Sequence, residues 1–312
     1  MVPIYSKHGQ LKCYRKFSLG EKDCLILIHS IYFFDLKTKL VLLSVSVNIM
    51  SSYSKVYFPK LNLFAYNDIF QHIKQVWDPL KKLKKTILKL LAEDLTGDPL
   101  EKIPGLILDS SSSIKGITVE RWIKLEAPII SKALGIWIDS GTILEPTAII
   151  KGPAIIGKNN EIRQGAYIRD GILMGDNCVI GHCTEIKNSI LMNHVEAGHF
   201  NYIGDSILGS FVNMGAGSRL ANVQFRRLEE KMNNFINLIE IPIEGKLIST
   251  ELQKLGAIIG DNVEIGCNAV ICPGALIGKD NWIYPNCTVP KGFHAPEHFI
   301  TPSSHKLKSR PK

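Results

Sequence analysis

The stretch IIGKNNEIRQGAYIRDGILMGDNCVIGHCTEI (residues 155–186) carries the strongest structural signal in the chain, because an aliphatic side chain recurs in it at every sixth position. The same spacing begins at Ile138, restarts at Leu191 and Leu208 after slips of one residue, and runs again from Ile259 to Val289. A spacing of six matches neither an α-helix nor one long strand. It indicates short strands joined by tight turns rich in Gly, Asn and Asp, with one aliphatic of each strand facing inward. Three such units make a triangular coil, and stacked coils make a solenoid.

The repeat is expected over residues 118–292, with a charged and irregular insertion at 223–256. A coil has no interior room for an insertion, so this segment is expected to loop outward, where it can cover a binding groove. It should contain a hairpin with the turn EGK (244–246). The predicted fold is therefore mainly β: a parallel β-helix with one long loop insertion and an N-terminal helical segment.

Residues 50–117 are expected to form that helical region and a linker. Helical patterning covers 67–95, where Asn67 or Asp68 can cap a first helix and Pro79 can open a second. The second helix carries lysines on one side and an apolar stripe on the other, by which it is expected to dock onto the rest of the domain. The stripe consists of Leu80, Leu83, Ile87, Leu90 and Leu91.

Residues 1–49 fit poorly with the rest of the chain. Their apolar runs, 24–34 and 41–48, are shorter than the ~20 residues that a membrane-spanning helix needs. The segment also lacks the features of a signal peptide. We therefore expect no transmembrane segment, and we interpret 1–49 as a non-native extension with translation beginning at Met50. Residues 293–312 are expected to be a basic tail.

Charge and cysteine usage narrow the class of protein. The net charge of +8 comes largely from basic runs at 81–89 and 305–312, which we interpret as solvated surface and not as a nucleic-acid site. The seven cysteines form no CxxC pair, and the chain is long enough to bury a core without disulfides. This usage indicates reduced thiols and a cytoplasmic protein.

The segments EIKNSIL (185–191), AGHFNYIGD (197–205) and VNMGAG (212–217) carry a family resemblance. Over residues 163–222, without a gap, the chain resembles the acetyltransferase domain of the bifunctional N-acetylglucosamine-1-phosphate uridyltransferases/glucosamine-1-phosphate acetyltransferases. The resemblance to hexapeptide-repeat acyltransferases continues to about residue 290, and some solenoid-only relatives are assigned as sugar-phosphate nucleotidylyltransferases. It implies a left-handed β-helix, a homotrimer with sites between neighbouring solenoids, and acetyl-CoA as co-substrate.

The resemblance also implies roles for single residues. His199 falls at the catalytic base, and Asn222 falls at the asparagine that supports this base and the incoming acyl group. The other matched positions contact substrate or cofactor: Tyr202 and Asn213 the amino sugar, Lys187, Lys254 and Arg169 the sugar phosphate, and Ala216 and Cys267 acetyl-CoA. Lys254 matches only if the insertion lies between it and Asn222, and Cys267 replaces a serine of the family.

Arg163 is the rival of Arg169 for the phosphate. Arg169 and Lys187 each directly follow an inward aliphatic and are one coil apart, so adjacent coils should stack them where two cations can hold one phosphate.

The implied chemistry suits these residue types. N-acetylation requires that an amine lose its proton as it attacks a thioester, and a neutral imidazole can take that proton. A backbone N–H near Ala216 can stabilise the negative charge that grows on the thioester oxygen. No metal is required. Glucosamine 1-phosphate is the implied acceptor, in the synthesis of nucleotide sugars for the cell envelope.

Two features depart from the family pattern. No G-x-G-T-x-M loop occurs, and too few residues precede the repeat for a nucleotidyltransferase domain, so uridylyl transfer by this chain is not expected. No Tyr-Asp-Gly follows Asn222, and the insertion replaces a short turn, so acceptor specificity can differ or activity can be lost.

Two alternatives stay open at the level of sequence. The solenoid can be a non-catalytic or regulatory module that binds a separate nucleotidyltransferase. It can also be a zinc enzyme like the trimeric solenoid carbonic anhydrases, whose H-x4-H pair appears here as His194 and His199. Their third zinc ligand would fall near Asn159, where there is no histidine, and His182 should face a different side from His194.

Overall fold

The computed structural model describes residues 33–34, 40–41, 55–111 and 115–302. The chain divides into two units, residues 1–47 and 48–312. In the first, the described parts are the antiparallel strands β1 (Phe33–Phe34) and β2 (Leu40–Val41). Apart from these two strands, the predicted extension 1–49 with a start at Met50, and the end of the basic tail, lie outside the described residues. In the part of the chain that is described, no helix has the length and apolar character needed to cross a membrane.

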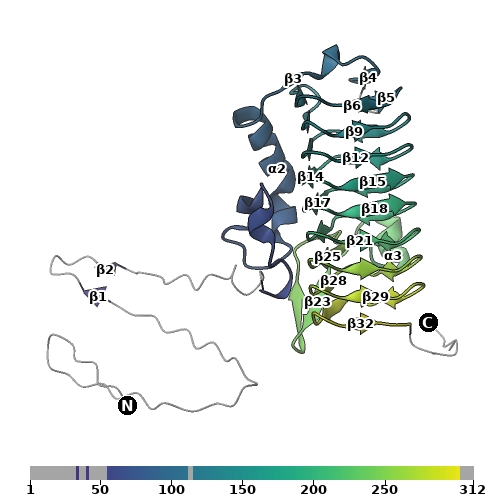
Figure 1. Cartoon of the computed structure of the whole chain (residues 1–312). Helices are drawn as coiled ribbons and strands as arrows, with labels where there is room; N and C mark the ends of the chain where they lie inside the picture. The colour runs from purple at the N-terminus through teal and green to yellow at the C-terminus, as the bar shows by residue number, and fades with distance from the viewer. Residues whose placement is uncertain (1–32, 35–39, 42–54, 112–114, 303–312) are drawn as a thin grey trace. The chain divides into compact units, whose positions relative to one another are not determined.

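The second unit is built of stacked three-sided coils (Figure 1). Each full coil contributes one short strand to each of three sheets, which we call sheets I, II and III. Sheet I consists of β3 (Asp98–Pro99), β7 (Ile129–Ser131), β8 (Ile136–Ile138), β11 (Ala154–Ile156), β14 (Ile172–Met174), β17 (Ser189–Leu191), β20 (Ile207–Leu208), β25 (Ala257–Ile259), β28 (Ala275–Ile277) and β31 (Gly292–His294).

Sheet II consists of β6 (Ile123–Lys124), β9 (Ile143–Leu144), β12 (Glu161–Ile162), β15 (Val179–His182), β18 (Glu196–His199), β21 (Asn213–Met214), β26 (Glu264–Ile265), β29 (Trp282–Ile283) and β32 (Phe299–Ile300). Sheet III consists of β4 (Leu106–Asp109), β5 (Gly116–Val119), β10 (Ile149–Lys151), β13 (Tyr167–Ile168), β16 (Glu185–Lys187), β19 (Tyr202–Gly204), β22 (Arg219–Leu220), β27 (Val270–Ile271) and β30 (Thr288–Val289). Within a coil the chain passes from sheet II to sheet III and then to sheet I.

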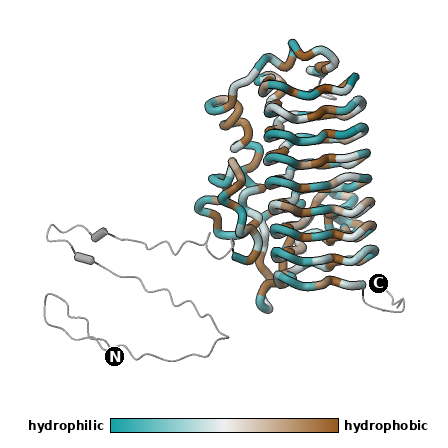
Figure 2. The backbone as a smooth tube through the Cα atoms, in the orientation of Figure 1, coloured by the Kyte–Doolittle hydropathy of each residue, from teal (hydrophilic) through white to brown (hydrophobic). Residues whose placement is uncertain are grey.

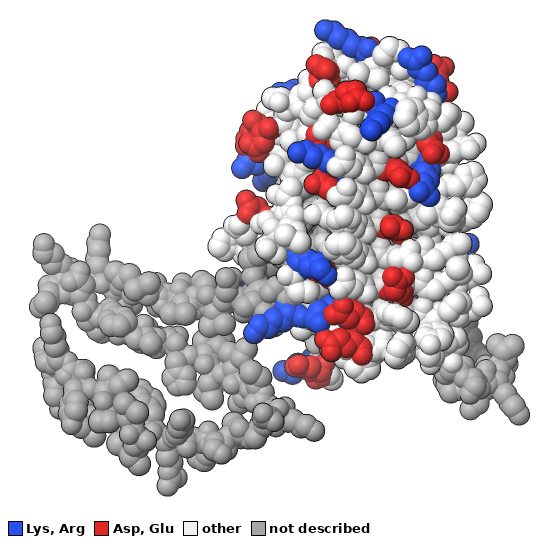
Figure 3. Space-filling view, viewed as in Figure 1, with Lys and Arg blue, Asp and Glu red and all other residues white. Residues whose placement is uncertain are grey.

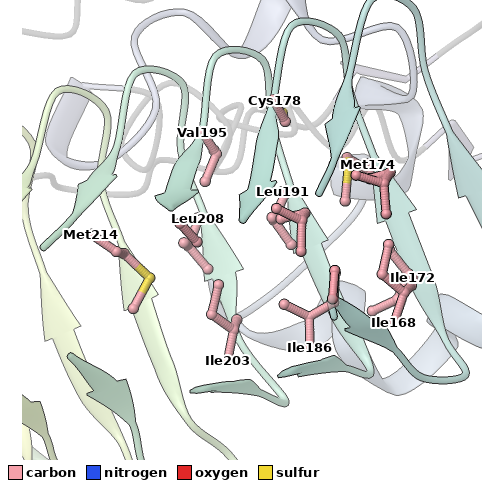
Figure 4. Close-up of a cluster of buried hydrophobic side chains, with 14 of the residues drawn as sticks. Ile168, Ile172, Met174, Cys178, Ile186, Leu191, Val195, Ile203, Leu208 and Met214 are labelled. Carbon is pink, nitrogen blue, oxygen red and sulfur yellow. The ribbon is translucent and has the colours of Figure 1, made fainter. Parts of the chain in front are cut away.

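The six-residue repeat forms the core, as predicted. Parallel pairing aligns equivalent residues of successive coils, for example Ile168 with Ile186 and Ile186 with Ile203. These side chains stack along the axis (Figure 4), and hydrophobic segments recur in every coil (Figure 2). All the repeat positions from Ile138 to Val289 belong to one buried cluster. Their burial is the main driving force for the fold.

Both ends of the solenoid differ from the predicted boundaries. The continuous parallel ladders start at β8, β9 and β10. Before them β3 pairs in parallel with β7, but β4, β5, β6 and β7 each make an antiparallel pairing with a neighbouring strand. The first coil has no earlier coil to pair with, and these antiparallel strands cover its otherwise open edge. At the other end, β31 and β32 continue the parallel ladder beyond residue 292.

The outer face of sheet I is covered by the N-terminal segment. This segment contains the 3-10 helices η1 (Leu61–Leu63), η2 (Asn67–Phe70) and η3 (Leu100–Lys102) and the helix α2 (Asp78–Glu93). Leu83 and Ile87 of α2 join the outward side chains Ile155 and Leu173 of sheet I in one buried cluster, which confirms the predicted docking. The predicted cap was wrong, because residues 67–70 form a 3-10 turn without a side-chain cap.

The insertion contains the short helix α3 (Leu228–Met232) and the predicted hairpin, whose strands are β23 (Glu240–Ile243) and β24 (Lys246–Ser249). Both turn residues, Glu244 and Gly245, have positive φ, which suits the twist of a two-residue hairpin. The hairpin buries Ile241 in the same cluster as α2, so it completes the cover of sheet I. The outer faces of sheets II and III carry no such cover among the described residues.

Gly181 gives a test of coil stacking. A Cβ at Gly181 would lie 1.8 Å from the carbonyl oxygen of Gly198 in the next coil, whereas a Cβ at Gly198 would meet nothing within 4 Å. We expect Gly181→Ala to lower the free energy of unfolding by about 1–3 kcal/mol, since the clash is with backbone. Gly198→Ala is the matched control and should change it far less. Equal denaturation midpoints for the two variants would contradict this account of the stacking.

Candidate functional site

The predicted site residues lie mainly along the two edges of sheet III. The II–III edge is where the chain turns from sheet II into sheet III, at residues 198–201, 215–218 and 266–269. The III–I edge is where it turns from sheet III into sheet I, at residues 169–171, 187–188, 204–206 and 221–222.

A hydrogen-bonded cluster occupies the III–I edge, with the buried Asp205 at its centre. The carboxylate of Asp205 accepts hydrogen bonds from the side-chain amides of Asn222 (2.5 Å) and Asn188 (2.7 Å), and it lies 3.8 Å from Nζ of Lys187. The hydroxyl of Tyr202 donates to Oδ1 of Asn222 at 3.2 Å. The fold thus brings Lys187, Tyr202 and Asn222 together and fixes the orientation of the Asn222 amide.

The Tyr202 phenol is held in its neutral form. Burial raises its pKa above the usual value, and the nearby Glu185 and Asp205 carboxylates raise it further. Glu185 lies directly beside Tyr202 in the sheet register. The hydroxyl therefore keeps its proton near neutral pH and can act as a hydrogen-bond donor.

The arginines separate into two places. Arg169 lies on the III–I edge, where its guanidinium binds Glu185 at 2.8 Å, and its N–H pairs with Ile186 O at 2.8 Å, so it stacks beside Lys187 as predicted. Arg163 follows β12 of sheet II and binds Glu161 at 2.6 Å. Arg163 therefore does not belong to the sheet III cluster, because its position in the coil is at the end of a sheet II strand.

Lys254 lies at the end of the insertion, next to Asn222. The N–H of Leu255 donates to the carbonyl of Asn222 at 3.2 Å, so the chain returns to the III–I edge at this point. The insertion lies between Asn222 and Lys254, which is the condition under which Lys254 matches the family position. Its side chain is exposed.

His199, Ala216 and Cys267 form a column along the II–III edge. The carbonyl of His199 accepts the N–H of Gly217 at 3.0 Å, and the carbonyl of Ala216 accepts the N–H of Asn268 at 2.9 Å. Three successive coils therefore place these residues above one another. The imidazole is exposed, and the backbone N–H of His199 donates to Oδ1 of Asn201 at 3.1 Å.

One chain does not gather all the predicted residues into a single cleft. His199 and Asn222 lie on opposite edges of sheet III, about six residue positions or roughly 20 Å apart at extended spacing. Asn213 lies on sheet II, where its amide donates to Glu264 at 2.8 Å. The position of each residue within its three-sided coil determines the edge or sheet on which it lies. The coil cannot bend to bring its two edges together.

Asp205 and Glu185 were not among the site residues predicted from the sequence. Asp205 lies in the segment AGHFNYIGD, three residues after Tyr202, and Glu185 precedes Tyr202 by one coil. The coil period places both next to cations of the predicted site, so this period was the signal that could have identified them.

The two histidines of the zinc alternative lie apart. His194 precedes β18 and stacks on the ring of Phe211 at 4.4 Å, whereas His199 ends β18. His182 is in register with His199 on sheet II, and so lies on a different side from His194. Among residues 55–111 and 115–302 there is no group of three side chains able to hold a metal ion.

Acidic and basic side chains are interspersed on the face that carries sheet II (Figure 3).

Comparison with known proteins agrees with the architecture. Residues 150–266 match the family model described as the GMPPB C-terminal domain, and residues 256–291 match that of the bacterial transferase hexapeptide (six repeats). A bifunctional sugar-1-phosphate nucleotidylyltransferase/acetyltransferase of Sulfurisphaera tokodaii is 33% identical over 68% of this chain and 53% of that protein. The bifunctional protein GlmU of Methanococcus aeolicus is 33% identical over 60% of this chain and 43% of that protein.

The chain thus spans about half the length of the relatives it matches. A solved structure of AntD, an N-acyltransferase from Bacillus cereus, in complex with dTDP and coenzyme A, is 18% identical, covers 53% of this chain and 82% of that chain, and gives a TM-score of 0.21. From the repeat, the three-sheet architecture and the hexapeptide family model, the chain is a hexapeptide-repeat protein with the fold of a left-handed parallel β-helix, and it is similar to proteins named as acetyltransferases.

Proposed function

We propose that the protein is a CoA-dependent N-acetyltransferase that acts on an amino-sugar phosphate, with glucosamine 1-phosphate as the acceptor, in cytoplasmic nucleotide-sugar synthesis. The cluster of Lys187, Tyr202 and Asn222 around Asp205 carries this proposal. It offers a cation, a neutral hydroxyl and a fixed amide on one edge of an open sheet. These groups suit a phosphorylated sugar, and no metal takes part.

The transfer step uses the opposite edge of sheet III. The acceptor amine attacks the thioester carbon, a C–N bond forms, and the C–S bond breaks with release of the CoA thiolate. His199 takes the proton that the amine loses. Backbone N–H groups near Ala216 stabilise the oxyanion, in a column that also holds Cys267.

We further propose that the working site lies between copies of the chain in a homotrimer. The two edges of sheet III are too far apart to act together within one chain, and sheet I is closed by α2 and the hairpin. Sheets II and III are the walls left open for packing, so a II–III edge of one copy can meet a III–I edge of another. A cyclic arrangement lets every copy contribute both edges.

The proposed function is tested by CoA thiol release. Purified protein is mixed with acetyl-CoA and a panel of glucosamine 1-phosphate, glucosamine 6-phosphate, glucosamine and N-acetylglucosamine 1-phosphate. We expect thiol release with glucosamine 1-phosphate and none with the acetylated sugar, since that control has no free amine. Absence of release with every amino sugar would overturn the proposal and favour the alternative of a non-catalytic module bound to a separate nucleotidyltransferase.

Cys267 provides a direct test of where the acyl donor binds. Cys267 and Cys183 are both exposed thiols, on opposite sides of His199 along the II–III edge. We expect acetyl-CoA to slow the alkylation of Cys267 by iodoacetamide several-fold while Cys183 reacts at its original rate, as measured by peptide mass spectrometry. Burial raises the pKa of Cys178 to about 12, so that thiol should stay unlabelled and serve as an internal reference. Equal labelling of Cys267 with and without acetyl-CoA would exclude this position of the donor.

A further inference from the structure

The cations of the insertion differ from those of the sheet III cluster in their partners. Arg169 and Lys187 both lie beside carboxylates, those of Glu185 and Asp205. Arg226 and Arg227, at the start of the insertion, have no acidic partner for their guanidinium groups among the described residues. A half-buried arginine such as Arg226 loses hydration without gaining a counter-ion, so an anionic ligand would stabilise it.

The two arginines line a hollow of about 260 Å³ in the insertion, together with Gln224, Phe225, Glu230, Ile236 and Asn237. Glu230 is the acid of this hollow, but both of its oxygens are engaged. One accepts the backbone N–H of Arg227 at 2.6 Å, and the other accepts the amide of Asn237 at 2.5 Å. Glu230 therefore holds the loop in shape and leaves both guanidinium groups free for a ligand.

A third cation and an aromatic ring lie at the hollow. Nζ of Lys291 donates to Oε1 of Gln224, which brings its charge to the edge of the hollow. Phe225 also lines the hollow, yet its ring is fully exposed to solvent. An exposed ring beside paired guanidinium groups offers a flat apolar surface on which a nucleobase can stack.

We propose that the insertion binds a nucleoside diphosphate, with Arg226 and Arg227 on the diphosphate and Phe225 against the base. Two planar guanidinium groups match the oxygens of a diphosphate. The insertion begins directly after Asn222, so the ligand lies next to the III–I edge. Two ligands share this chemistry: a nucleotide-linked sugar, and the adenosine diphosphate part of coenzyme A. The site does not depend on acetyl transfer and is measured by binding alone.

The test is calorimetric titration of the full chain with UDP, 3′-phosphoadenosine 5′-diphosphate and inorganic pyrophosphate at low salt. We expect at least one nucleotide to bind more tightly than pyrophosphate. Arg226→Gln and Arg227→Gln should each weaken that nucleotide about tenfold, the effect of losing one charged hydrogen-bonding group. Phe225→Ala should remove the preference over pyrophosphate. Arg121→Gln, at the far end of the solenoid, is the matched control and should bind as the wild type does.

The identity of the tighter nucleotide distinguishes the two sources. Preference for UDP assigns the site to the sugar nucleotide, and preference for the adenosine compound assigns it to coenzyme A. Pyrophosphate binding as tightly as both nucleotides, or arginine variants that bind like the wild type, would overturn the proposal. His199→Ala should leave the titration unchanged, so loss of acetyl transfer and loss of this site are separable.

Discussion

Replacing His199 with alanine is expected to slow acetyl transfer by about 100- to 10,000-fold, the usual contribution of a general base. The amine would then lose its proton without a positioned acceptor. The KM for acetyl-CoA should change little, because Ala216 and Cys267 lie on other coils of the II–III edge. The measurement is CoA thiol release at saturating acceptor.

His194→Ala is the matched control for this variant. His194 stacks on Phe211 before the start of β18, away from sheet III. His194→Ala removes an imidazole from the turn that precedes the same strand, so the rate of this variant should stay close to that of the wild type. Equal rates for His199→Ala and the wild type would show that His199 is not the base.

Replacing Ile150 with alanine is expected to lower the free energy of unfolding by about 2–5 kcal/mol. Ile150 is fully buried in β10, between Ile117 of β5 and Ile168 of β13. Stacked coils cannot close around the missing atoms without breaking the strand register, so most of the cavity should remain.

Ile149→Ala is the control, because Ile149 is the neighbouring residue of the same strand and points to the half-buried outer face. It should cost about 1 kcal/mol or less. Urea denaturation followed by circular dichroism measures both. If the two variants lose equal stability, the inward ladder is not the main source of stability in this wall.

The ladder was predictable from sequence because burial selects the residue type at every sixth position, as at Ile168 and Ile186. The antiparallel strands before β8 were not predictable in this way. These strands cover the first coil of the solenoid. No earlier coil packs against that side, so burial between coils does not select an aliphatic residue at every sixth position there. The 3-10 turn at 67–70 was also missed. Ile69 and Phe70 of this turn are buried in the cluster shared with sheet I, and such contacts distant in sequence leave no local pattern.

The candidate site was predictable as a set of residues but not as an arrangement. The family resemblance predicted Lys187, Tyr202 and Asn222 as site residues, and the coils place these three side chains together. The ion pairs between basic and acidic side chains, such as Arg169 with Glu185, form between neighbouring coils. A sequence motif does not show such contacts. The distribution of His199 and Asn222 over two edges follows from the phase of the repeat and points to a second copy of the chain.

The cover on sheet I changes how the array can come apart. Lys60 donates its backbone N–H to Asp261 at 2.8 Å, while α2 lies against β14 and β17, so one segment grips coils that are distant along the axis. A bare stack of repeats, linked only to nearest neighbours, can fray turn by turn from either tip. This segment contacts several coils at once. If one of the coils beneath it unfolds, contacts of the covering segment are lost as well, so the unfolding of distant coils becomes cooperative.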